Sequence, residues 1–178
     1  MLKYNYFSSL CKLTEKCCTG AELACKNGAQ ASIKINKALT EAYTSLCELE
    51  RALFSEFIPP LDRSGIVAYA HALCSLSDAA IVYSTASPTR RLSSSPKGFD
   101  GYCVSLCDIL RESSAMLNGI KKSSEIPRIE EFRGARSQAL ASIYIPPLSP
   151  QAVCARQGLI FAISGAFDTL IELILKSI

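Results

Sequence analysis

The sequence predicts an all-α protein of about six antiparallel helices, arranged as two similar three-helix bundles with pseudo-twofold symmetry. Apolar residues recur with the 3.6-residue period of a helix, and no segment of useful length alternates apolar and polar residues as a strand would. A proline-containing corner also occurs twice, half a chain apart. The 178 residues are 49% hydrophobic and 20% charged, which is enough apolar material for a large core.

The repeated corner reads FIPPLD at residues 57–62 and YIPPLS at residues 144–149, an offset of 87 residues (144 − 57). Each proline pair should end a helix, because proline lacks an N–H and disfavours helical geometry in the residue before it. Asp62 and Ser149 suit the N-cap of the next helix, and Pro150 suits its first position. Two matched corners with matched caps indicate an internally duplicated chain.

Six helices are expected in order, over roughly residues 3–28, 31–57, 63–85, 99–123, 127–145 and 150–178. The third helix carries a seam of small residues: Ile66, Ala70, Leu73, Ser77 and Ala80. The fourth has an apolar stripe: Cys103, Leu106, Cys107, Leu110 and Leu117. The sixth has the longest stripe: Ile163, Phe167, Leu170, Ile171, Ile174 and Ile178. These spacings place each set on one helix face.

A segment rich in Ser, Pro and basic residues, 87–98, separates the third helix from the fourth and is predicted to be a solvent-exposed linker. It divides a single domain, 1–178, into a first three-helix half, 1–86, and a second, 99–178. The net charge of +3 comes from scattered Lys and Arg, without the basic stripe of a nucleic-acid binder. Nucleic acid is therefore not an expected partner.

Nine cysteines occur, an odd number, at positions that fall within helical patterns. The N-terminus lacks the uninterrupted apolar stretch of a signal peptide, so we expect a cytoplasmic protein whose thiols are reduced and mostly buried. Cys103 and Cys107 are one turn apart and could bind a metal or cross-link, but their apolar stripe favours core packing. Cys17 and Cys18 point in different directions, so one of them is expected to be exposed.

The most apolar segment, 159–178, is interrupted by Asp168 and Glu172, which favours a buried core helix over a membrane span. Enzyme motifs are missing from the sequence: there is no Walker loop, no dinucleotide-binding glycine pattern and no H-E-x-x-H. A nucleophilic site would have to use His71, the only histidine, and no nucleophile motif accompanies it. The chain is therefore predicted not to be an enzyme.

The stretch LFSEFIPPLDRSGIVAYAHALCSLSDAAIVY, residues 53–83, resembles the PhoU-like phosphate transport regulators. The positions that carry the match are Phe57, Ile58, Pro60, Asp62, Arg63 and Ile66. The resemblance implies a duplicated three-helix bundle in the cytoplasm that regulates phosphate transport through protein–protein contact. The partners it implies are a Pit-type phosphate permease, another membrane or signalling protein, or a second copy of the chain.

In this family, acidic E/D-x-x-x-D motifs hold iron or zinc on the bundle surface. Here Cys74 and Ser75 stand where acids are expected, and only Asp78 remains on the third helix. On the sixth helix, Asp168 keeps the second acid of the motif while Ser164 replaces the first. A divalent ion needs several converging carboxylates, so we expect no bound metal and no other cofactor.

Two alternatives remain open. His71, Cys74 and Asp78 fall within an arc of about 60° on the third helix, so an imidazole, a thiolate and a carboxylate could form a substitute site for zinc or iron. This would make the chain a metal-binding helical protein. The other alternative is a helical scaffold that keeps the fold but has changed its partner.

Overall fold

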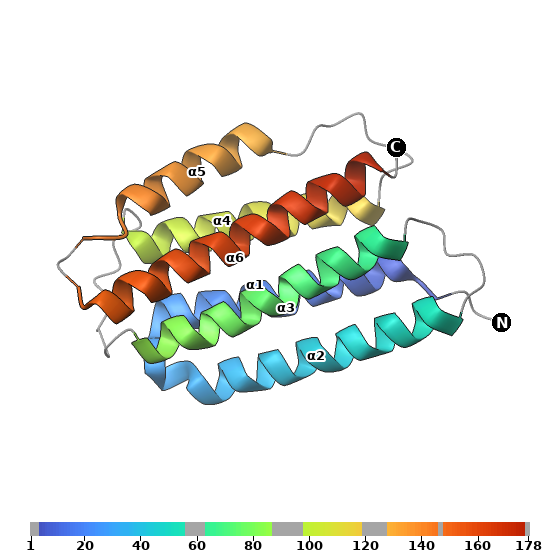
Figure 1. Ribbon diagram of the computed structural model, residues 1–178, viewed down its shortest axis with the longest axis horizontal. Coiled ribbons are helices and arrows are strands. Elements are labelled where there is room, and N and C mark those ends of the chain that lie inside the picture. Colours follow the sequence, from blue (N-terminus) through green and yellow to red (C-terminus); the bar gives the residue numbers. More distant parts are fainter. Residues whose placement is uncertain (1–3, 56–62, 87–97, 119–127, 146–147, 177–178) are drawn as a thin grey trace.

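The structure is a computed structural model, and it describes the chain outside residues 1–3, 56–62, 87–97, 119–127, 146–147 and 177–178 (Figure 1). The described residues form six α-helices and two short 3₁₀ turns, and no strand occurs among them. The prediction of an all-α bundle is therefore confirmed.

The first half of the chain folds into three long helices: α1 (Tyr6–Asn27), α2 (Ser32–Ser55) and α3 (Arg63–Ala86). Asn5 caps α1, because its side-chain oxygen accepts a hydrogen bond from the Ser8 N–H at 3.0 Å. After α1, Gly28 has φ 51°, a left-handed conformation that glycine adopts without strain. It begins the 3₁₀ turn η1 (Gly28–Ala31), which leads into α2.

The second half contains α4 (Phe99–Ala115), extended by the 3₁₀ turn η2 (Met116–Asn118), then α5 (Ile129–Ala141) and α6 (Pro150–Leu175). Ser149 is the N-cap of α6, as predicted, and its hydroxyl accepts a hydrogen bond from the Ala152 N–H at 3.3 Å. Pro150 occupies the first turn. Both proline pairs of the predicted corners lie outside the described residues, between helices.

Each of the first three helices packs against the other two, and the same holds for α4, α5 and α6. The two groups meet through α3 against α6 and α1 against α4. Figure 1 shows the result: α3 and α6 lie side by side in front, α1 and α4 lie behind them, and α2 and α5 form the two outer edges.

Two helices end earlier than predicted. The fourth was expected to reach residue 123, but α4 ends at Ala115 and its last turn tightens into η2. The fifth was expected to reach residue 145, but α5 ends at Ala141 and residues 142–145 form a turn. A turn at this point leaves backbone carbonyls without the partners that a helix would give them.

Arg156 supplies those partners. It lies in the second turn of α6, is 7% exposed, and donates from Nη1 to the carbonyls of Ser142, Ile143 and Ile145 at 3.1, 2.9 and 2.7 Å. Its guanidinium carbon also lies 4.7 Å from the centre of the Phe99 ring. A single buried cation thus joins the end of α5 to the starts of α4 and α6.

The cysteines are all free thiols. Six are buried, as expected for most of them: Cys17, Cys18, Cys25, Cys74, Cys103 and Cys107. The prediction that one of Cys17 and Cys18 is exposed is wrong, because both are 0% exposed. Helix α1 packs against α2, α3 and α4 at once, so neighbouring positions that point in different directions are covered by different helices.

Candidate functional site

The three residues of the predicted substitute metal site lie on α3 with different partners. His71 is exposed, and its Nε2 lies 2.9 Å from Oε1 of Glu50 on α2. Cys74 points inward and is 2% exposed. Asp78 is exposed and accepts a hydrogen bond from the Tyr43 hydroxyl at 2.9 Å. Among the described residues, no three His, Cys, Asp or Glu side chains are placed to share a metal ion.

These contacts change the acidity of two groups. The hydrogen bond to Asp78, followed by burial and the Asp78 charge, raises the pKa of Tyr43 to about 12. Burial, followed by the Asp78 charge, raises the pKa of Cys74 to about 11. The Cys74 side chain is therefore a neutral thiol at neutral pH.

Three of the remaining family-motif positions lie among the described residues. Arg63 begins α3, and Ile66 is fully buried in the core one turn later. Asp168 is an exposed residue of α6. Four predicted positions lie outside the described residues: Phe57, Ile58, Pro60 and Asp62.

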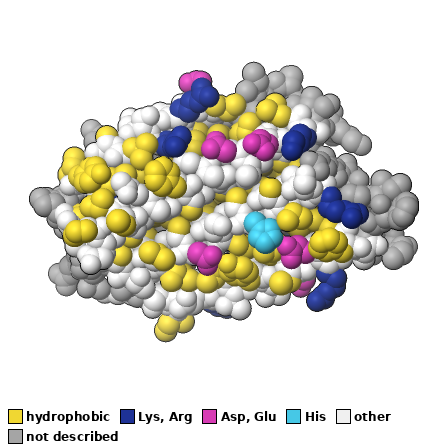
Figure 2. Space-filling model, in the orientation of Figure 1, with side chains coloured by type: hydrophobic (Ala, Val, Ile, Leu, Met, Phe, Trp, Pro, Cys, Tyr) yellow, Lys and Arg dark blue, Asp and Glu magenta, His cyan; other side chains and the backbone are white. Residues whose placement is uncertain are grey.

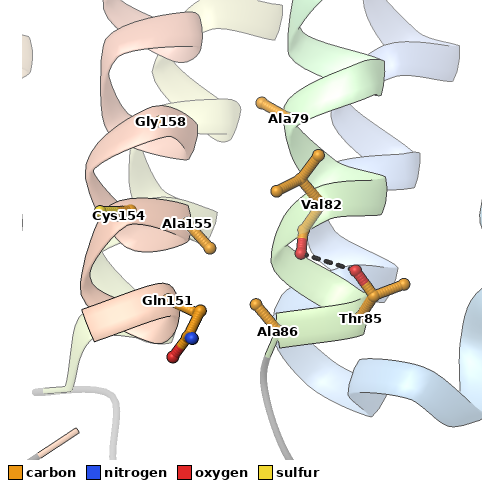
Figure 3. Close-up of a pocket in the computed structure, with 8 residues that line it drawn as sticks. All are labelled: Ala79, Val82, Thr85, Ala86, Gln151, Cys154, Ala155 and Gly158. Carbon is orange, nitrogen blue, oxygen red and sulfur yellow. Dashed lines mark hydrogen bonds between the residues drawn. The ribbon is translucent and has the colours of Figure 1, made fainter. Parts of the chain in front are cut away.

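A groove lies between the last turns of α3 and the first turns of α6 (Figure 3). Its volume is about 640 Å³. Eight residues line it, four from each helix: Ala79, Val82, Thr85, Ala86, Gln151, Cys154, Ala155 and Gly158. Small side chains on both helices produce the groove, because they leave space between the two backbones that larger side chains would fill.

No residue that lines the groove carries a charge. The Thr85 hydroxyl donates to the Val82 carbonyl at 3.0 Å (dashed in Figure 3), so its hydrogen is already used inside α3. The lining therefore offers no cation to neutralise an anion such as phosphate. It suits an apolar surface of complementary shape, such as a helix or a side chain from another protein.

Large apolar side chains are exposed both in the groove and one turn beyond it on α6. Val82 of α3 is 56% exposed and Phe161 of α6 is 57% exposed, both high values for large hydrophobic side chains. In the view of Figure 2, hydrophobic side chains gather toward the left of this face, where α3 ends and α6 begins, and charged side chains lie mostly toward the middle and right. Contiguous exposed apolar surface marks an interaction site more often than single exposed residues do.

The groove was not predicted from the sequence, although a signal was present. Gln151, Cys154, Gly158 and Phe161 recur at helical spacing on α6, on a face away from the core stripe through Ile163 and its successors. A second face of small and apolar residues, on a helix that already has a core face, is the sequence signal for such a groove.

Two helices in the described part of the chain, α3 and α6, are long and apolar enough to cross a membrane by length and composition. They pack against each other, and 44% and 50% of their most apolar windows are buried within the protein. Core helices of soluble proteins pass the same test, so this property does not assign the chain to a membrane. The chain matches no protein-family model and no curated protein.

Proposed function

We propose that the protein is a PhoU-like accessory protein of phosphate transport in the cytoplasm, which acts by protein–protein contact and not by catalysis. The proposal rests on the likeness of residues 53–83 to the corner and third helix of that family, and on the uncharged groove between α3 and α6. The groove is the observation that carries the mode of action, because its uncharged lining of mostly small side chains suits the docking of an apolar helix.

The arrangement of the helices supports an internal duplication. If α1, α2 and α3 correspond to α4, α5 and α6, then both contacts between the halves join corresponding helices, an arrangement that a twofold axis allows. The 87-residue offset relates Asp62, a predicted N-cap outside the described residues, to Ser149, the N-cap of α6. It also relates Ile66, which is buried, to Val153, which packs against the same core.

The proposed mechanism is docking of the α3–α6 face on an apolar helix of a Pit-type permease or of another membrane or signalling protein. Small residues allow close approach of a partner helix, Val82 supplies exposed apolar area in the groove, and Phe161 supplies it one turn further along α6. The groove gives no reason to expect a bound anion, so phosphate would be sensed by the partner.

Two glycines allow a matched test. Gly158 lines the groove and Gly134 lies on α5, and both are exposed helical positions where an added Cβ would meet no atom within 4 Å. Arginine at either position should therefore leave the fold intact and favour its helix by up to about 1 kcal/mol. Only Gly158→Arg places a charged side chain in the groove.

The measurement is binding of the purified protein to a purified Pit-type permease from the same genome, together with phosphate uptake in cells that carry each variant. We expect Gly158→Arg to weaken binding at least tenfold and to disturb regulation of uptake, while Gly134→Arg behaves as the unmodified chain. Absence of binding by the unmodified chain, or equal binding by both variants, would contradict the proposal.

A further inference from the structure

Three side-chain contacts define the register of α1 against α4. The Cys11 thiol donates to the Ser114 carbonyl at 3.1 Å, and Asn118 donates from its side chain to the Cys11 sulfur at 3.4 Å. Further along, Nε of Arg111 lies 2.9 Å from a carboxylate oxygen of Glu15. Moving forward along α1 therefore means moving backward along α4, so the two helices are antiparallel.

This register brings cysteines of the two helices face to face. Seven residues after Cys11, Cys18 falls opposite residues 107–111, and fourteen residues after it, Cys25 falls opposite residues 100–104. Cys107 and Cys103 occupy these two levels. All four thiols are buried, so two cysteine pairs are stacked inside the interface that joins the two halves of the chain.

The acidity of the thiols agrees with this pairing. A hydrogen bond with Cys107, followed by burial, raises the pKa of Cys18 well above its ordinary value. A hydrogen bond with Cys103, followed by burial, does the same for Cys25. Cys17 lies near the Cys18–Cys107 pair. Burial raises the pKa of its thiol to about 12, and the Cys74 and Cys107 thiols add to the rise.

We propose that the Cys18–Cys107 and Cys25–Cys103 pairs are binding sites for a soft monovalent metal ion, Cu(I), with each ion held between two thiolates. In each site two S–H bonds break, two S–Cu bonds form and two protons leave to solvent. Two neutral thiols and one Cu⁺ give a bis-thiolate complex of charge −1 and two H⁺. The metal enters as Cu(I), so no electron is transferred.

The chemistry of the pairs favours this ion. Thiolates select Cu(I), whereas Mg²⁺ and Ca²⁺ require oxygen ligands. Structural Zn²⁺ sites take four ligands, and in the described part of the chain no three metal-binding side chains converge. With metal–sulfur bonds of about 2.3 Å in line, the two sulfurs would stand roughly 4.5 Å apart. A disulfide would instead need the sulfurs about 2 Å apart.

The test is an anaerobic titration of the fully reduced chain with Cu(I) supplied as its bicinchoninate complex, followed by the absorbance of that complex and by the sulfur-to-copper charge-transfer band. We expect two Cu(I) per chain. Cys18→Ala and Cys103→Ala should each remove one equivalent, and the double variant should remove both. The matched control, Cys47→Ala with Cys154→Ala, removes the two exposed thiols and should retain two equivalents.

Circular dichroism of each metal-free variant establishes that it is folded, and the two single variants decide the question if the double variant does not fold. Less than one equivalent bound by the unmodified chain would overturn the proposal. The same holds if the control variant loses as much copper as the double variant does. A thermal midpoint that stays unchanged on loading would also contradict it, because an ion that binds only the native state raises stability.

Discussion

The outer helices of the two halves, α2 and α5, occupy corresponding places at opposite edges of the molecule but are held in different ways (Figure 1). Helix α2 has 24 residues and buries five: Ile35, Ala42, Leu46, Leu49 and Leu53. Helix α5 has 13 residues and buries only Phe132 and Ala139. The difference teaches that a long edge helix is held by its apolar face, whereas a short one needs a few specific contacts.

Two of those contacts are identifiable. The rings of Phe132 on α5 and Phe167 on α6 are stacked, with centres 3.8 Å apart. At the end of α5, Arg156 binds the carbonyls of the following turn. The residue 87 positions earlier is Tyr69, which is 0% exposed and whose hydroxyl lies 2.7 Å from that of Thr14 on α1. The same place in each half therefore holds a polar side chain, but only in the second half does that residue complete a truncated helix.

The largest effect is expected from Arg156→Met, which keeps an apolar stem near Phe99 and removes the three hydrogen bonds that Arg156 donates to the turn after α5. Several carbonyls would lose their charged donor, and each buried unpaired group costs about 1–3 kcal/mol. We expect the free energy of unfolding to fall by about 4 kcal/mol, measured by urea denaturation. The matched change in the first half, Tyr69→Phe, removes one hydroxyl contact and should cost about 1 kcal/mol. Equal losses would remove the distinction between the two positions.

A smaller effect, confined to one helix, is expected from Phe132→Ala. Loss of the stacked ring should cost about 3 kcal/mol, at the low end for phenylalanine truncation. The effect should be confined to α5, because Phe132 is one of only two buried residues on that helix. Hydrogen exchange should become faster in α5 and stay nearly unchanged in α1 and α3. Leu49→Ala on α2 is the comparison, and it should lower the protection of the whole first half. Faster exchange throughout the chain in Phe132→Ala would mean that α5 is not an independently opening edge.

The smallest effect concerns the hydrogen bond between Tyr43 of α2 and Asp78 of α3, which has no counterpart in the second half because Gly165 stands 87 residues after Asp78. Folding raises the pKa of Tyr43 from 10.0 to about 12, so it favours the neutral phenol. The stabilisation is present below pH 10 and is lost as the pH rises toward 12. Tyr43 is partly exposed, so it amounts to less than about 1 kcal/mol.

Absorbance titration of the phenolates in the native protein measures this pKa. Tyr43→Phe should remove the last phenol that titrates among the exposed ones, and Asp78→Asn should bring the Tyr43 pKa back toward 10. An Asp78→Asn variant in which Tyr43 still titrates near 12 would show that the carboxylate is not the cause.

Much of the fold followed from local rules. Helix formers, proline pairs and capping residues act within a few residues of one another, so the positions of all six helices could be predicted. The early end of α5 could not, because it depends on Arg156, which comes fifteen residues after Ala141 and is brought back by the corner. An arginine in an apolar helix gives no indication of its partner, and only the folded arrangement supplies one.

The candidate sites were less accessible to prediction. The angular arc that groups His71, Cys74 and Asp78 describes one isolated helix, and it omits the neighbouring α2, whose Glu50 and Tyr43 bind the outer two residues. The cysteine pairs share this difficulty. The spacing of Cys103 and Cys107 indicates that they share a face of α4, but the register against α1 decides which thiols meet.

Helix α1 leaves the ribosome long before one of its packing partners. Ala115, the last residue of α4, follows Asn27, the last residue of α1, by 88 residues (115 − 27). At a synthesis rate of about 5–20 residues per second, this separation corresponds to roughly 4–18 seconds. Helices α2 and α3 can dock on α1 in that time, but the face that carries Cys18 and Cys25 stays open to solvent. Oxidants and thiophilic ions reach these sulfurs more easily during synthesis than at any later time, so the order of emergence influences the chemistry of the finished core.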